Sequence, residues 1–118
     1  MSDNLQQAKK LIKKCLNTQN TYLDLGNCGI TNLNDLPELF ECKHIEILIL
    51  SNNWWNFEKR EWIESQNKGE SNKLKILPNQ IAQLQNLKTI ILYDVFVIKN
   101  PDINILGKLN SLSTLYLR

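Results

Sequence analysis

The apolar residues of this chain repeat with a fixed spacing. After a shift of 25 residues, one run of five apolar positions falls on another. The first run is Ile81, Leu84, Leu87, Ile90 and Leu92, and the second is Leu106, Leu109, Leu112, Leu115 and Leu117. The same shift places Leu23 on Leu48, whereas Leu48 reaches Ile90 only after a shift of 42 residues. The sequence therefore predicts four repeated units, with an insertion after the strand of the second.

Each unit contains two apolar residues separated by one position, which is typical of a short strand. Because side chains alternate along a strand, these two residues face a core and their neighbours are displayed on the other side. Apolar residues three positions apart precede the later strands, and at 77–87 and 103–112 this spacing predicts short helical return segments. The pattern predicts an α/β fold with a parallel sheet.

The repeat resembles the leucine-rich repeat family, whose pattern is L-x-x-L-x-L-x-x-N/C-x-L. The second unit matches this pattern at Ile45, Leu48, Leu50, Asn53 and Trp55. The resemblance implies a right-handed solenoid of about four turns, with the parallel sheet on its concave face. At the bend after the second strand, Asn53 is expected to bond backbone groups that would otherwise be unpaired.

We expect one leucine-rich repeat domain over residues 1–118. An apolar stripe predicts an amino-terminal cap helix over 1–19, followed by four repeats over 20–118 with an insertion at 56–73. The cap and the segment TYLDLGNCGIT look like the start of bacterial leucine-rich repeat proteins, some of which carry a Ras-like GTPase domain downstream. The phosphate-binding pattern G-x-x-x-x-G-K-[ST] does not occur in this sequence.

The insertion combines hydrophilic residues with several aromatic ones. Asn56 is predicted to cap a short helix over residues 57–66. Trp55 falls on a core position of the repeat. Phe57 and Trp62 either pin the inserted segment to the body or contact a partner, since tryptophan is enriched at binding hot spots.

The last strand, at 114–118, has no return segment after it in this sequence. Leu115 and Leu117 are therefore expected to be exposed, beside backbone groups without partners. Either the chain is a fragment or something covers this edge. Self-association through the edge is one way to cover it.

Composition and charge narrow the classes of function. The net charge of +2 is too small for a surface built mainly to bind nucleic acid or anionic lipid. Three cysteines without a secretion signal fit a reducing compartment, so we expect a cytoplasmic protein. The single histidine, His44, is expected at the surface with no nucleophile beside it, and the cysteines lack paired metal-ligand spacing. The sequence predicts no enzymatic activity, cofactor or metal.

The displayed face of the sheet is the predicted binding surface. Its central positions form an apolar stripe with a charged end, and aromatic residues of the insertion add a lateral contact. The predicted protein-binding residues are Tyr22, Asp24, Ile49, Ile91, Tyr93, Tyr116, Phe57 and Trp62. The predicted function is recognition of a protein partner. The alternative is a scaffold or self-association segment of a larger leucine-rich repeat protein, which uses the last strand.

Overall fold

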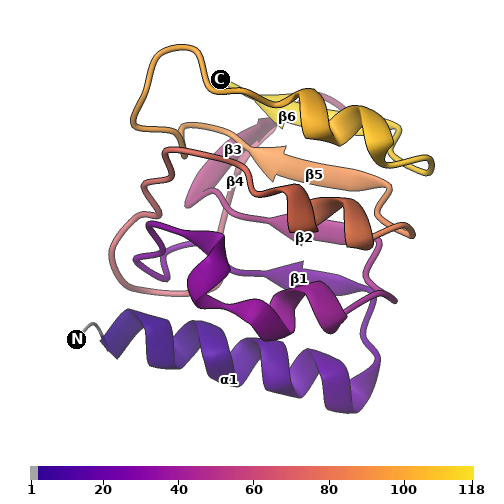
Figure 1. Ribbon diagram of the computed structural model, residues 1–118. Coiled ribbons are helices and arrows are strands. Elements are labelled where there is room, and N and C mark those ends of the chain that lie inside the picture. The colour runs from indigo at the N-terminus through magenta and orange to yellow at the C-terminus, as the bar shows by residue number, and fades with distance from the viewer. Residues whose placement is uncertain (1–2) are drawn as a thin grey trace.

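A parallel sheet forms the centre of the computed structural model, which describes residues 3–118 (Figure 1). All three pairs of neighbouring strands are parallel. The strands lie in the order β1 (Tyr22–Asp24), β2 (Ile47–Ile49), β5 (Thr89–Leu92) and β6 (Thr114–Leu117). With one α-helix packed at an end of this sheet, the chain is a mixed α/β protein whose extents are 31 × 28 × 27 Å. No helix in the described part of the chain is both long and apolar enough to cross a membrane.

The register of the sheet is the one that the repeat predicts. Leu23 pairs with Leu48, Leu48 with Ile90, and Ile90 with Leu115. These pairs correspond to the shifts of 25, 42 and 25 residues, so this prediction is confirmed. A slip of one residue would turn every leucine of a strand to the other face, and burial of one face therefore fixes the register.

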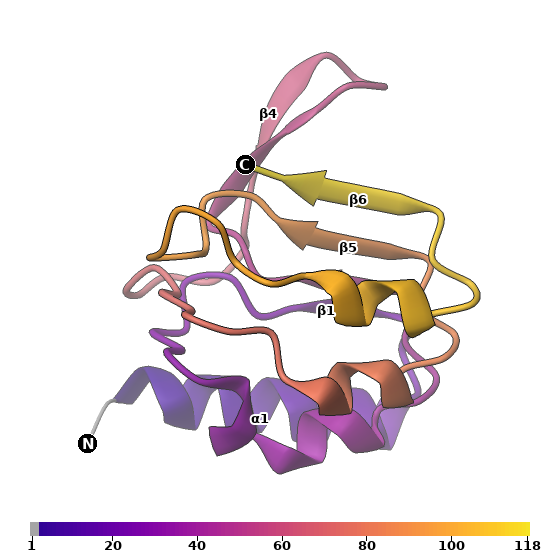
Figure 2. The same cartoon turned by 45° about the horizontal axis from the view of Figure 1, so that its top comes forward.

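The return segments are 3₁₀ helices on one side of the sheet, and the predicted helical returns are confirmed in this form (Figure 2). Ile81, Leu84 and Leu87 are fully buried. Ile81 lies within a 3₁₀ helix, and the N–H groups of Leu84 and Leu87 donate to the carbonyls of Ile81 and Leu84, so bonding between residues three apart continues beyond the helix to Leu87. The segments are η1 (Leu33–Asp35), η2 (Pro37–Glu41), η3 (Asn79–Gln83) and η4 (Asn104–Lys108).

The amino-terminal cap helix is present as α1 (Asp3–Thr18), which lies along the β1 side of the molecule (Figure 1). Ala8, Ile12 and Cys15 are buried in the main core, as the apolar stripe predicts. The helix ends before Gln19, whose φ of 57° is left-handed, a common way to terminate a helix. Residues 1 and 2 of the predicted cap lie outside the described residues.

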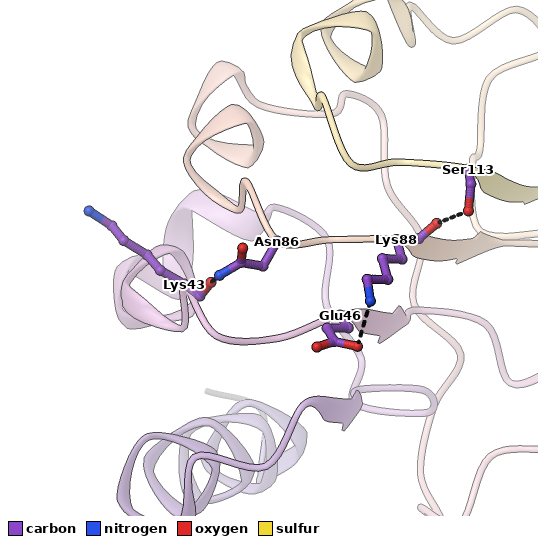
Figure 3. Close-up of polar contacts among 5 residues, drawn as sticks. All are labelled: Lys43, Glu46, Asn86, Lys88 and Ser113. Atoms are coloured by element: carbon purple, nitrogen blue, oxygen red, sulfur yellow. Dashed lines mark hydrogen bonds and ion pairs between the residues drawn. The ribbon is translucent and has the colours of Figure 1, made fainter.

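Polar side chains link neighbouring units where the strands begin (Figure 3). The Lys88 ammonium lies 3.4 Å from the Glu46 carboxylate, and the Ser113 hydroxyl donates to the Lys88 carbonyl at 3.4 Å. The Asn86 amide donates to the Lys43 carbonyl at 2.7 Å. Both charged side chains of the ion pair are largely exposed to solvent. Such pairs contribute at most about 1 kcal/mol, so the apolar core rather than this row holds the units together.

The insertion is a β-hairpin, and the predicted helix over 57–66 is wrong. β3 (Asn53–Asn56) pairs antiparallel with β4 (Glu61–Glu64), and we call residues 53–64 the hairpin. The Asn56 side chain accepts a hydrogen bond from the Lys59 backbone N–H at 2.9 Å, which closes a turn instead of starting a helix. Tryptophan and isoleucine also favour a strand, because their bulky side chains pack well on a pleated surface.

Asn72, and not Asn53, bonds the backbone at the bend. The Asn72 amide donates to the carbonyls of Leu25 and Leu50, both at 2.8 Å, and its carbonyl accepts from the Ile30 N–H at 2.8 Å. Asn53 instead begins β3 opposite Glu64. The prediction for Asn53 is therefore wrong, and the inserted hairpin begins earlier than the predicted boundary at residue 56. The chain resumes the repeat at Asn72, whose side chain is buried between two units.

Candidate functional site

The hairpin covers part of the sheet face that lies opposite the return segments (Figure 2). Trp54 packs against Ile49 and Ile91 in a small second core, and all three are at most 4% exposed. The prediction that Ile49 and Ile91 are displayed on the sheet is wrong, because the chain's own tryptophan covers them. The expected core position of Trp55 is also wrong, since Trp54 is the buried residue and Trp55 is half-buried.

Asp24 anchors the segment that follows the hairpin. Its carboxylate accepts hydrogen bonds from the Ser65 hydroxyl at 2.8 Å, the Gln66 N–H at 3.0 Å and the Gly26 N–H at 2.9 Å. The residue is buried. The prediction that Asp24 displays a charge at the sheet surface is therefore wrong. Its carboxylate fixes the segment directly after β4 to the end of β1.

Gly26 allows this close approach. A Cβ atom at position 26 would lie 2.6 Å from the Ser65 Cβ and would also meet the Ser51 carbonyl oxygen. We expect Gly26→Ala to lower the free energy of unfolding by about 1–3 kcal/mol, because the chain after the hairpin must shift to admit the methyl group. Urea unfolding followed by circular dichroism measures this loss.

Gly107→Ala is the matched control, since a Cβ atom at position 107 has no heavy atom within 4 Å. Its expected effect is within about 0.5 kcal/mol. Equal losses for both alanine variants would show that the approach at Gly26 is not tight in solution.

Aromatic side chains form a row beside the hairpin, and we call Phe57, Trp62, Tyr93 and Tyr116 the aromatic row. The rings of Phe57 and Tyr116 stack with centroids 6.4 Å apart, and Trp62 meets Tyr93 edge-on at 5.8 Å. These contacts join the hairpin to the sheet, which is one of the two roles predicted for Phe57 and Trp62. They still leave Phe57 72% and Trp62 53% exposed, so both rings also offer surface to a partner.

Arg118 closes one end of the aromatic row. Its guanidinium donates to the Tyr93 hydroxyl at 2.9 Å and lies 5.4 Å from the centre of that ring. It also lies 3.8 Å from the Asp94 carboxylate. The hydrogen bond to Tyr93 and the charge of Asp94 raise the pKa of Arg118 above its ordinary value. The cation is thus held against the tyrosine and remains charged.

A groove of about 350 Å³ remains between the hairpin and the sheet. Ile49 and Ile91 lie at its base, where Trp54 covers most of their surface, and the hairpin forms one of its walls. Threonine and tyrosine residues together with Glu58 and Lys59 are the polar members of its lining. The groove is lined by Tyr22, Ile47, Ile49, Trp54, Asn56, Glu58, Lys59, Ile63, Thr89, Ile91, Thr114 and Tyr116.

The structure brings together most of the predicted binding residues. Four of them, Tyr22, Ile49, Ile91 and Tyr116, line the groove, and the aromatic row adds the other aromatic ones. Sequence reasoning missed Trp54 and Ile63, which face the sheet from the hairpin. The residues around Ile63, Glu61-Trp62-Ile63-Glu64, do not alternate between polar and apolar, so only the strand preference of tryptophan and isoleucine indicates a strand there.

His44 lies next to a cysteine, which differs from the prediction. Its Nε2 atom is 3.3 Å from the Cys15 Sγ and 3.1 Å from the Cys15 carbonyl oxygen, and the ring is half-buried. Burial raises the pKa of the Cys15 thiol, whereas a nucleophilic cysteine needs a lowered pKa. The thiol also donates to the Asn20 carbonyl at 3.3 Å. This pair therefore links the cap helix to the segment that leads into β2.

No protein-family model matches the chain, and no curated protein matches it either.

Proposed function

We propose that this chain is a leucine-rich repeat module that recognises a protein partner without catalysis. The groove and the aromatic row beside it form the binding surface. In this proposal the four strands and their 3₁₀ returns are successive turns of a short right-handed solenoid, and α1 caps its first turn. The hairpin is an arm inserted in the second turn.

Two features support the family assignment. The four strands pair in the register that the leucine repeat predicts, with residues of equal position side by side. Asn72 joins two successive units through their backbone carbonyls, which is a role suited to the asparagine of the family pattern. Both features follow from stacking one repeated unit on the next.

The observation that carries the binding proposal is the exposure of large aromatic rings around an apolar groove. Phe57 and Trp62 stay more than half exposed although each contacts a ring of the body. Aromatic side chains lose little conformational entropy on binding and dominate the centres of protein interfaces. A groove of about 350 Å³ is at the lower end of the range for small ligands and accommodates one or two apolar side chains of a partner.

The buried thiols support a cytoplasmic location, which we also propose. Cys15, Cys28 and Cys42 are free and buried, and burial raises the pKa of Cys28 and of Cys42 to about 12. Free thiols in a folded chain are typical of a reducing compartment.

A peptide library displayed on phage tests the proposal. Peptides selected against the 118-residue chain are expected to perturb the backbone amide signals of Thr89, Thr114 and Tyr116 in nuclear magnetic resonance spectra. Thr89→Arg places a long side chain in the groove and is expected to weaken the selected peptides at least about tenfold.

The control for this experiment is Ile76→Arg. Ile76 is exposed and lies with Asn79 and Lys108 on the side of the return segments, so this variant is expected to bind the peptides as the parent does. Peptides that perturb the return segments instead of the groove, or that bind Thr89→Arg unchanged, would refute the groove as the site.

A further inference from the structure

We propose that two copies of the 118-residue chain pair through the free edge of β6. β6 pairs with β5 on one side, and no other strand of residues 3–118 pairs with its second side. Leu115 and Leu117 are each 40% exposed. An apolar strand with one free edge is a template for pairing with another strand.

The hydrogen-bonding direction of each residue in β6 follows from its pairing. The Thr114 N–H donates to the Lys88 carbonyl at 3.0 Å, so the backbone groups of Thr114 point toward β5. Since this direction alternates along a strand, Tyr116 also bonds toward β5, whereas the N–H and C=O groups of Leu115 and Leu117 point to the free edge.

The sequence of β6 suits a second copy of itself. Leu115, Tyr116 and Leu117 read the same in both directions. In an antiparallel pair with Tyr116 opposite Tyr116 of the other copy, each Leu115 stands opposite a Leu117. Both of these residues direct their backbone groups outward, so a Leu115 and the Leu117 opposite it exchange two hydrogen bonds. Because the dimer has two-fold symmetry, it contains two such leucine pairs. The leucines of both copies then lie on the same face of one continuous sheet.

The charges near β6 do not oppose this pairing. Residues 114–117 carry no charge, and Arg118 is already held by Asp94 and Tyr93 of its own chain. Natural edge strands commonly carry a lysine, a proline or a bulge that prevents pairing, and β6 has none of these within its bounds. The strand therefore lacks the usual protection, and its hydrogen-bonding groups match those of a second copy.

Sedimentation equilibrium over a concentration series tests the pairing. The expected result is a reversible species of twice the 13.8 kDa mass of one chain. Hydrogen exchange at high concentration is expected to slow at the amides of Leu115 and Leu117, and to change little at Tyr116, whose amide already bonds toward β5. A chain that stays monomeric at its highest soluble concentration would overturn the proposal.

Two variants distinguish pairing through β6 from nonspecific association. Leu117→Lys adds a charge at the edge, and Leu117→Pro removes an N–H that has no acceptor in β5; each is expected to weaken the dimer at least about tenfold. Ile76→Lys is the matched control, because Ile76 is similarly exposed but lies on the side of the return segments. A dimer that resists both Leu117 variants, or that Ile76→Lys weakens equally, would also overturn it.

Discussion

Trp54→Ala is expected to lower the free energy of unfolding by about 3–5 kcal/mol, the loss usual for a buried aromatic residue replaced by alanine. Trp54 is the hairpin residue that fills the space above Ile49 and Ile91. Its removal leaves a cavity and exposes both isoleucines to water. Urea denaturation followed by circular dichroism measures the change, and a smaller urea dependence would indicate that the hairpin has already detached.

Phe57→Ala is the control for this variant. Phe57 belongs to the same hairpin and stacks on Tyr116, but it is largely exposed. An exposed aromatic pair contributes about 1 kcal/mol, so the expected loss is small. If Phe57→Ala cost as much as Trp54→Ala, the hairpin would be held by its tip and not by the tryptophan at its base.

Asn72→Ala is expected to destabilise the chain by about 3 kcal/mol or more. The substitution removes the partner of the Ile30 N–H and of the Leu25 and Leu50 carbonyls, each bonded at 2.8 Å. Asn72 is buried, so water does not readily replace these bonds, and each group left without a partner costs about 1–3 kcal/mol. Thermal and urea unfolding of the parent chain and of Asn72→Ala measure the difference in stability.

Asn53→Ala distinguishes the observed bend from the one that the repeat pattern predicts. Asn53 is half-buried at the start of β3, and its side chain makes no such bridge between units, so the expected loss is within about 0.5 kcal/mol. A larger loss for Asn53→Ala than for Asn72→Ala would mean that Asn53 holds the bend in solution and that the hairpin begins later.

The sheet and its returns could be predicted because their signals are local and repeated. Leu23, Leu48, Ile90 and Leu115 occupy the same place in their units. Only one register of the four strands places all of these residues on the same buried face. The spacing of three in the returns likewise indicates a helix with a single buried face. These predictions depend on the chain's own period and need no knowledge of distant contacts.

The hairpin could not be predicted in this way. Trp54 and Trp55 are adjacent and both apolar, so the period of a strand does not decide which of them faces the body. Packing above Ile49 and Ile91 decides it, and the contact with Ile91 joins residues far apart in the sequence. Asn53 also satisfies the repeat pattern by position, although the chain leaves the repeat before it and returns at Asn72. The chain itself therefore covers the isoleucines of the stripe that the sequence predicts as the binding surface.

The hairpin changes how this molecule is expected to unfold. In arrays of stacked units each unit contacts only its neighbours, so the terminal ones can fray independently. Here the hairpin and the segment after it reach β1 through Asp24, β2 and β5 through Trp54, and β6 through Phe57. The first and the last strand are thereby coupled through one segment that crosses the stack. Loss of the last strand is therefore expected to weaken the contacts with the first, and we expect the chain to unfold as a single cooperative unit.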